Sequence, residues 1–189
     1  MSARLRQLPN LISAARIVLV LPIGVALAHR DWPVAIGLIV IATLSDGADG
    51  FLAKRFAWRT RLGAVLDPAA DKLLVGTVFV VLALQGGVPM WLMAAAVGRD
   101  LGIAFGALAC RLRFGPLRVR PSAVSKLNTL CQLCYVLCVV LRREIDWPRA
   151  WVATALGALT LVTIAVSGLD YALIYWRGAR RLTRVEAGP

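Results

Sequence analysis

The chain has 189 residues, of which 59% are hydrophobic, and its 22 Lys and Arg against 10 Asp and Glu give a formal net charge of +12. A mean hydropathy of +0.74 excludes an ordinary soluble domain. The basic excess alone would be compatible with nucleic-acid binding, but apolar runs of membrane-spanning length exclude that as the main function. We therefore expect one membrane domain over residues 1–189, with a basic tail from about residue 177.

Six apolar runs follow one another along the chain, and each is long enough to form a membrane-spanning helix. Tryptophans such as Trp91 and Trp147 lie near the ends of these runs, where aromatic side chains anchor a helix at the membrane interface. The sequence thus predicts an all-α integral membrane protein built as a bundle of six transmembrane helices. The runs cover residues 11–28, 33–53, 67–84, 89–110, 123–141 and 148–176.

The basic residues are distributed unevenly over the connections between these runs. Most of them lie at the amino end, between the second and third runs, between the fourth and fifth, and in the tail. Because Lys-rich and Arg-rich connections stay in the cytoplasm, we expect both termini to be cytoplasmic. The first run is also compatible with a signal peptide cleaved after Ala28. That alternative is disfavoured, since removing the first run would spoil the charge asymmetry.

Four carboxylates stand out from the largely apolar sequence between residues 46 and 71. Asp46 and Asp49 are three residues apart, and Asp67 and Asp71 are four apart, so each pair shares one face of a helix. Two antiparallel helices joined by the short basic turn between the pairs would direct all four into one small volume. Such a cluster repels itself unless cations or protons neutralise it. The pattern predicts a site for hard divalent cations, with Mg²⁺ the usual choice beside phosphates.

The same stretch resembles the signature of the CDP-alcohol phosphatidyltransferases. That signature reads Asp-x-x-Asp-Gly-x-x-Ala-Arg, then eight residues, then Gly-x-x-x-Asp-x-x-x-Asp. One position departs from it, because Lys54 stands where the family has an arginine. A lysine keeps the charge but loses the planar fork that grips a phosphate with two hydrogen bonds. The matching residues are Asp46, Asp49, Gly50, Ala53, Gly63, Asp67 and Asp71.

The resemblance implies an enzyme that transfers a phosphatidyl group from CDP-diacylglycerol to an alcohol and releases CMP. In the family's scheme the first three aspartates hold Mg²⁺ or Mn²⁺, and the fourth, Asp71, is the general base; all four are candidate metal ligands here. Gly50 and Ala53 let the cytidine approach the helix backbone, Lys54 contacts the diphosphate, and Gly63 is also placed among the substrate-binding residues. The family further implies a homodimer.

Polar residues of the other runs are expected at the same membrane depth as the aspartates. Ser13 and Arg16, three apart in the first run, resemble the family's opening, whose polar residues approach the nucleotide end of the substrate. Arg99, next to an aspartate, lies in the fourth run, and Lys126 and Asn128 lie in the fifth. Ionisable residues inside membrane spans indicate a site by default. The charge pair at 99 and 100 is also compatible with a role in orienting neighbouring helices.

Other features of the fourth and sixth runs are predicted to be structural. Gly102 and Gly106 in the fourth run, and Gly157 in the sixth, permit close contact between helices and need no catalytic role. Asp170 has no assigned role. The stretch 167–171 around it is expected to pair with a basic residue or to line the cavity.

The acceptor alcohol is predicted from residues 120–132, which read Arg-Pro-Ser-Ala-Val-Ser-Lys-Leu-Asn-Thr-Leu-Cys-Gln. This segment is similar to the eukaryotic-type cardiolipin synthases, with Pro-Thr/Ser-x-x-Ser-Lys-x-Asn-Thr-x-x-Gln, whereas phosphatidylglycerophosphate synthases carry Gly-Lys-x-Lys-Thr. A second lysine suits a dianionic phosphate monoester, and Asn128 suits a less charged phosphodiester such as phosphatidylglycerol. The resemblance implies cardiolipin synthesis from CDP-diacylglycerol and phosphatidylglycerol. Glycerol 3-phosphate, or another alcohol, is the alternative acceptor.

Outside enzymes, an ion-coupled transporter could also use carboxylates inside a membrane. The enzyme is favoured because the carboxylates are predicted to gather at one leaflet and no broken-helix repeat is visible. We expect the protein in a bacterial inner membrane, with its active site at the cytoplasmic leaflet. Its expected partners are the two lipid substrates and a second copy of the chain, and no nucleic acid.

Overall fold

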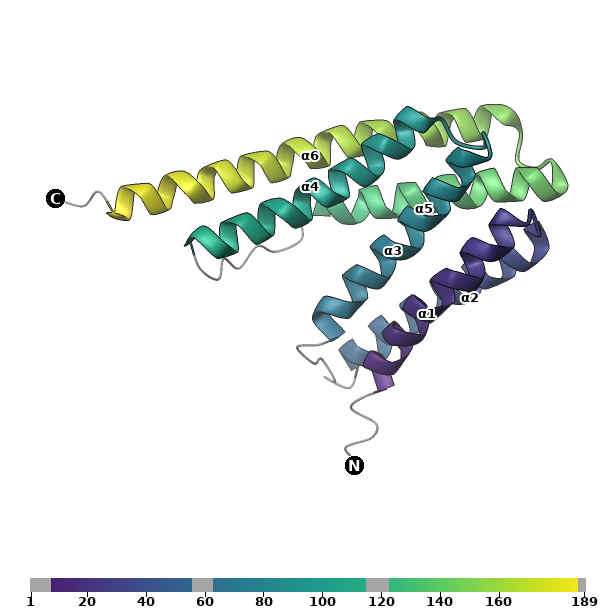
Figure 1. Ribbon diagram of the computed structural model, residues 1–189, viewed down its shortest axis with the longest axis horizontal. Coiled ribbons are helices and arrows are strands. Elements are labelled where there is room, and N and C mark those ends of the chain that lie inside the picture. The colour runs from purple at the N-terminus through teal and green to yellow at the C-terminus, as the bar shows by residue number, and fades with distance from the viewer. Residues whose placement is uncertain (1–7, 56–62, 115–122, 187–189) are drawn as a thin grey trace. The chain divides into compact units, whose positions relative to one another are not determined.

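The computed structural model describes residues 8–55, 63–114 and 123–186, with the side chains of residues 8–10, 48–55, 64–65, 110, 114 and 176–186 excepted. This part of the chain forms six α-helices and no strand, which confirms the predicted all-α architecture (Figure 1). The helices are α1 Leu8–Ala28, α2 Trp32–Arg55, α3 Gly63–Leu84, α4 Met90–Phe114, α5 Ala123–Ile145 and α6 Ala150–Glu186.

Each helix corresponds to one of the predicted apolar runs, and the differences lie at the ends. α3 begins at Gly63, one turn before the predicted run, and α6 continues to Glu186, well past residue 176. An α-helix makes its backbone hydrogen bonds within itself, so it need not end where its apolar sequence ends. The helix ends were therefore less predictable than the helices.

Among the described residues, four stretches are long and apolar enough to cross a membrane, namely Leu11–Ala28, Met90–Arg113, Ala123–Ile145 and Ala150–Tyr175. α2 contributes a shorter apolar stretch, Trp32–Gly47, within the described residues. α3 carries Asp67, Asp71 and Lys72 in its first half, which makes that half more polar. The two helices that carry the aspartate signature are thus the ones whose apolar stretches are interrupted. The long apolar helices make the chain an integral membrane protein.

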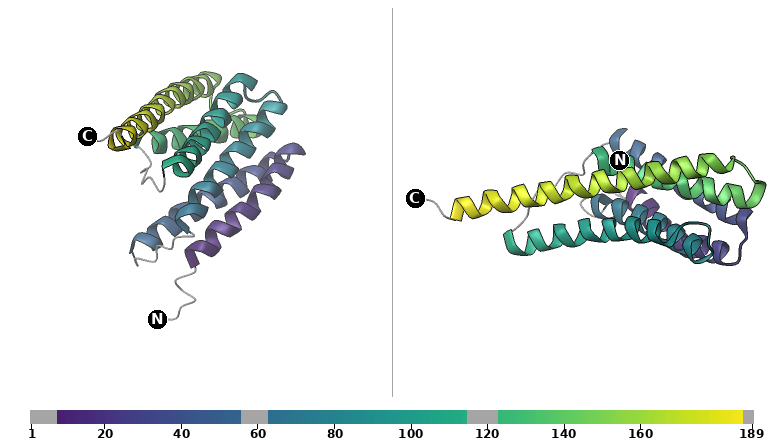
Figure 2. Two further views of the ribbon diagram at one scale, coloured as in Figure 1. Left: turned by 60° about the vertical axis from the view of Figure 1, so that its left-hand side comes forward. Right: turned by 90° about the horizontal axis from the view of Figure 1, so that it is seen from above.

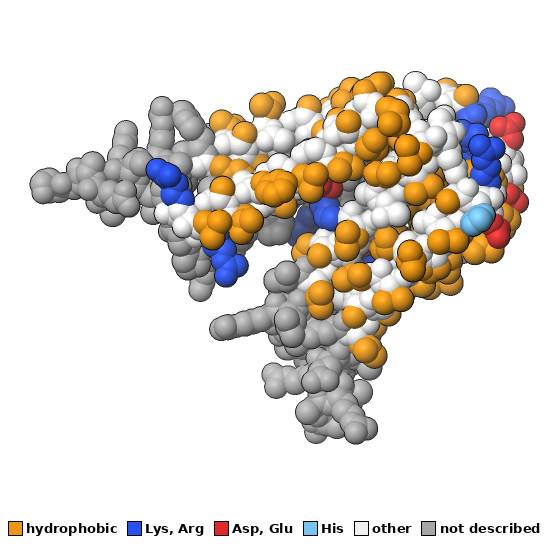
Figure 3. Space-filling view, in the orientation of Figure 1, with side chains coloured by type: hydrophobic (Ala, Val, Ile, Leu, Met, Phe, Trp, Pro, Cys, Tyr) orange, Lys and Arg blue, Asp and Glu red, His pale blue; other side chains and the backbone are white. Residues whose placement is uncertain are grey.

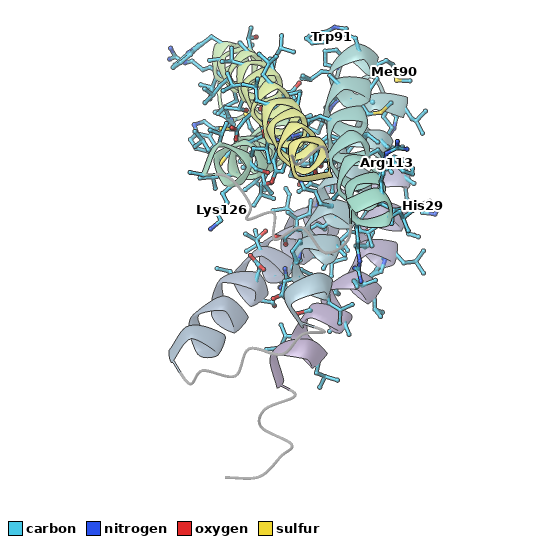
Figure 4. The ribbon with its side chains drawn as sticks, turned by 90° about the vertical axis from the view of Figure 1, so that its left-hand side faces the viewer. His29, Met90, Trp91, Arg113 and Lys126 are labelled. Carbon is cyan, nitrogen blue, oxygen red and sulfur yellow. The ribbon has the colours of Figure 1, made fainter. Side chains whose placement is uncertain are left out.

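Hydrophobic side chains are exposed along the outer faces of the helices (Figure 3). Leu21 and Leu112, for example, are 74% and 78% exposed. Contiguous apolar surface of this kind is rare on soluble monomers, and a lipid environment removes its cost. Trp91 is exposed near the start of α4, as expected of an interface anchor (Figure 4). Trp151 is likewise exposed near the start of α6.

The helices divide into two compact units. The first comprises Met1–Pro89 with Val136–Ala150, and therefore contains α1, α2, α3 and the end of α5. In this unit α1 packs against both α2 and α3, and the three helices lie side by side (Figures 1 and 2). The second unit comprises Met90–Tyr135 with Trp151–Pro189, and contains α4, the first part of α5, and α6.

Small residues allow close helix contacts in both units. In the first unit, a Cβ at Gly24 of α1 would lie 3.3 Å from the Thr77 methyl group of α3. In the second, a Cβ at Gly106 of α4 would lie 2.6 Å from the Tyr175 ring of α6. Gly102 differs from the prediction, because the described residues leave open space within 4 Å of it. A close helix contact therefore requires glycine at position 106 but not at position 102, about one helical turn earlier.

Candidate functional site

A buried arginine of α1 joins two of the signature aspartates. Arg16 is 1% exposed, and its Nη1 donates to Asp46 Oδ1 at 2.5 Å and to Asp71 Oδ1 at 2.7 Å. Since one nitrogen contacts both, the carboxylates of α2 and α3 lie side by side. The two aspartate side chains are 44% and 34% exposed. The anionic groups can thus be reached from outside, whereas their cationic partner cannot.

Asp67, the third signature aspartate with a described side chain, is contacted from the same face of α1. The hydroxyl of Ser13, which is fully buried, donates to Asp67 Oδ1. Ser13 and Arg16 are three residues apart and so lie on one helix face. α1 is otherwise almost wholly apolar. Its two buried polar residues therefore point toward the aspartates and supply a hydrogen bond to each of the three whose side chains are described.

The second unit contains a separate polar cluster centred on Arg99 of α4. Its Nη1 donates to Asp100 Oδ1 at 2.6 Å, and its Nη2 donates to Ser125 Oγ at 2.8 Å and to Ser167 Oγ. The guanidinium carbon also lies 5.8 Å from the ring centre of Tyr171, within cation–π range. Arg99 thereby links α4 to both α5 and α6.

Asn128 begins a polar seam between α5 and α6. It is fully buried, and its Oδ1 accepts a hydrogen bond from Thr163 at 3.0 Å. One turn along, the Thr160 hydroxyl donates to the carbonyl of Cys131 at 3.3 Å. Gln132 is 1% exposed, and within the described residues neither atom of its amide has a hydrogen-bond partner. Residue numbers rise along α5 from Asn128 to Cys131, whereas those of the α6 partners fall from Thr163 to Thr160. The two helices are therefore antiparallel.

The sequence indicated Asp100 as a partner of Arg99 but did not identify its two serine partners. The stretch 167–171 was expected to pair with a basic residue, and it does so through Ser167 and Tyr171, while Asp170 makes none of these contacts. Serine hydroxyls in apolar helices are common packing residues. Ser125 and Ser167 differ from such packing serines in accepting hydrogen bonds from Arg99. Those contacts follow from how the helices pack.

A comparison with known protein families shows to which family the chain belongs. Residues 6–166 match the family model described as CDP-alcohol phosphatidyltransferase, which covers most of the chain and all the described polar residues of the aspartate site. The chain belongs to the CDP-alcohol phosphatidyltransferase family.

Relatives of the chain carry the names of different enzymes. The chain is 29% identical over 180 residues to human cardiolipin synthase (CMP-forming), covering 87% of this chain and 60% of the human protein. It is 29% identical over 175 residues to a probable phosphatidylglycerophosphate synthase of Mycobacterium tuberculosis, covering 89% and 81%. It is also 30% identical over 190 residues to a chloroplastic CDP-diacylglycerol–glycerol-3-phosphate 3-phosphatidyltransferase of rice, covering 91% and 58%. The chain spans about three-fifths of the length of the human relative.

Several residues of the phosphatidyltransferase signature lie outside the described side chains. Asp49, Gly50, Ala53 and Lys54 belong to the last turns of α2, where the side chains lie outside the described part of the chain. Gly63 is buried at the first position of α3. The roles predicted for these residues in binding the cation, the cytidine and the diphosphate therefore stay predictions.

The described residues fit a divalent cation by their chemistry. Among them, no three acidic, histidine or cysteine side chains already form a metal site. The available donors are carboxylate oxygens from α2 and α3, which are the ligands that Mg²⁺ and Mn²⁺ prefer. A guanidinium lies against two of these carboxylates, so the site already accommodates positive charge. Asp49 would be the next ligand along α2.

Lys126 differs from the other predicted residues of α5. Its side chain is exposed and projects away from the neighbouring helices (Figure 4). Asn128, two residues later, faces the α5–α6 seam instead. Residues two apart on a helix point in different directions, so the two residues predicted to bind the acceptor do not share a helix face. Their roles in substrate binding stay predictions.

Proposed function

We propose that this chain transfers a phosphatidyl group from CDP-diacylglycerol to phosphatidylglycerol, forming cardiolipin and releasing CMP. The observation that carries the proposal is the meeting of Asp46 and Asp71 at one nitrogen of Arg16, within the family signature. A relative that shares this family is a CMP-forming cardiolipin synthase. The Ser-Lys-x-Asn-Thr sequence of α5 supports phosphatidylglycerol as the acceptor.

The reaction needs one group that accepts a proton and others that hold the diphosphate. The acceptor hydroxyl attacks the phosphatidyl phosphorus, and the bond from that phosphorus to the CMP oxygen breaks. Asp71 takes the hydroxyl proton; because its Oδ1 is bound by Arg16, Oδ2 is the atom proposed to receive it. When bound at the four aspartates, Mg²⁺ or Mn²⁺ would neutralise the charge on the diphosphate oxygens.

The remaining predicted residues are assigned to the substrates on the same basis. Ser13 and Arg16 approach the nucleotide end, where they already contact the aspartates. Arg99, Lys126 and Asn128 belong to the second unit and are proposed for the acceptor side. We place the site at the cytoplasmic leaflet because basic connections flank the aspartate helices. A bacterial inner membrane and a homodimer are further parts of the same proposal.

A phosphatidylglycerophosphate synthase is the second candidate. It is favoured by the relatives from Mycobacterium tuberculosis and rice, whose names specify phosphatidylglycerophosphate or glycerol 3-phosphate. The chain also covers 81% of the mycobacterial protein, against 60% of the human cardiolipin synthase. The two candidates share the aspartate site and differ only in the acceptor.

Product analysis separates these candidates. Purified protein in detergent receives CDP-diacylglycerol and Mg²⁺ or Mn²⁺ with either phosphatidylglycerol or glycerol 3-phosphate, and CMP and the lipid product are measured. We expect CMP and cardiolipin only with phosphatidylglycerol. Asp71→Asn should keep nucleotide binding and lose turnover by about 10²–10⁴-fold, as expected when a general base is removed.

Other outcomes of this experiment would be equally informative. Turnover with glycerol 3-phosphate alone would overturn the cardiolipin assignment and leave the family mechanism in place. Loss of metal-dependent nucleotide binding in Asp71→Asn would show that this residue is required to hold the cation, and would overturn its assignment as the general base. Ion flux across proteoliposomes without CMP release would instead identify a transporter.

A further inference from the structure

Arg16 occupies a position that a bound cation would share. It is 1% exposed, and its Nη1 lies 2.5 Å from Asp46 and 2.7 Å from Asp71. Burying a guanidinium without a carboxylate partner is costly. Because Arg16 is buried and forms ion pairs with these carboxylates, we expect it to stay beside them when a metal ion binds.

We propose that Arg16 is a resident counter-cation that makes divalent-cation binding at the aspartates depend on the substrate diphosphate. The inference rests on the proposed function, in which these aspartates hold the cation. It assigns Arg16 a positioning role in addition to the nucleotide contact. Arg16 would keep the carboxylates of α2 and α3 together before the cation binds, since adjacent carboxylates repel each other.

The coupling follows from the sign of the charges. A guanidinium and a divalent cation on the same two carboxylates repel each other, so the cation alone binds more weakly than the carboxylates would allow. A diphosphate brings negative charge to the same place and offsets that repulsion. Cation and diphosphate should therefore strengthen each other's binding, and by linkage the effect must be reciprocal.

Mn²⁺ binding to the full chain in detergent tests this coupling. Free Mn²⁺ is measured by its electron paramagnetic resonance signal, with CDP as a soluble diphosphate and with subtraction of the Mn²⁺ held by CDP in protein-free samples. For the wild type we expect CDP to tighten Mn²⁺ binding on the order of tenfold, within the usual range of coupling between sites. For Arg16→Gln we expect Mn²⁺ alone to bind on the order of tenfold more tightly, and the effect of CDP to shrink.

Two further variants separate charge from folding. Arg16→Lys keeps the positive charge and should retain the dependence on CDP. Arg113→Gln removes an exposed arginine near the end of α4 and should leave Mn²⁺ binding as in the wild type. Arg16→Gln should also unfold at lower temperature in EDTA and regain more stability from Mn²⁺ than the wild type does, because its unscreened carboxylates gain more from the ion.

The inference and the proposed function fail in different ways. A wild type that binds no Mn²⁺ and makes no lipid product contradicts the proposed function. A wild type that turns over, but whose Mn²⁺ affinity does not respond to CDP, overturns the inference alone, and this holds even if Arg16→Gln does not fold. Equal Mn²⁺ affinity in the wild type and Arg16→Gln would overturn it as well.

Discussion

At the residue scale, two buried arginines among the described residues lie in different settings. Arg16 contacts carboxylates from two other helices, and those carboxylates are partly exposed. Arg99 contacts the adjacent Asp100, two serine hydroxyls and an aromatic ring. The first setting leaves anionic oxygens that a ligand can reach. The second uses both terminal nitrogens of Arg99 to connect three helices, so its contacts support a role in packing beside the predicted substrate contact.

The packing role of Arg99 predicts a loss of stability when its planar guanidinium group is replaced. Arg99→Lys keeps the charge but cannot reach Asp100, Ser125 and Ser167 together, because an ammonium lacks the planar, two-armed geometry. Hydrogen bonds to charged groups contribute about 1.5–3 kcal/mol each, so we expect a loss of about 2 kcal/mol in the free energy of unfolding. Denaturant unfolding in detergent measures it.

Arg113→Lys is the matched control, since Arg113 is exposed on the same helix. It should leave the free energy of unfolding within about 0.5 kcal/mol of the wild type. Equal stability of Arg99→Lys and Arg113→Lys would contradict the packing role and leave Arg99 as a substrate-binding residue only.

At the element scale, α4 and α6 are in close contact where Gly106 faces Tyr175. The Tyr175 hydroxyl donates to the carbonyl of Ile103 in α4 at 2.9 Å. Both the ring and its hydroxyl are thus placed against the same turn of α4. The ring cannot move away from Gly106 without lengthening this hydrogen bond.

A methyl group at Gly106 should therefore destabilise the second unit. In Gly106→Ala the new Cβ would lie 2.6 Å from the ring, and overpacking of this kind costs about 1–3 kcal/mol. Gly102→Ala, one turn earlier, meets open space among the described residues and should be neutral or slightly stabilising, because alanine favours the helix. Thermal unfolding of the two variants checks the difference, and equal melting temperatures would show that the α4–α6 contact is looser than described.

The helices were predictable from sequence because each includes a long, largely apolar run, but their partners were not. Spacing alone placed Asp67 and Asp71 on one helix face. No spacing relates Ser13 to Asp67, 54 residues away, or Arg99 to Ser167, 68 residues away. Such contacts depend on which faces pack together, and apolar helices have weakly specified faces. The same limit applies to Gly102 and Gly106, which look alike in the sequence and differ only through Tyr175.

At the scale of the whole molecule, charge distribution and helix number predict the orientation. If all six helices cross the bilayer, both termini lie on one side, and the basic connections place that side in the cytoplasm. A fluorescent protein that matures only in the cytoplasm should fluoresce when fused to either end in a bacterial host. Alkaline phosphatase, active only outside, should be inactive at both ends. Phosphatase activity at one end alone would mean that an odd number of helices crosses.

The length of α6 has a practical consequence. Its apolar stretch ends at Tyr175, yet the helix continues to Glu186 without a break. At 1.5 Å per residue, this continuation carries the chain roughly 16 Å further along the helix axis. A spin label or fluorophore stepped along these residues would work as a molecular ruler, with each turn reporting a new height relative to the bilayer surface.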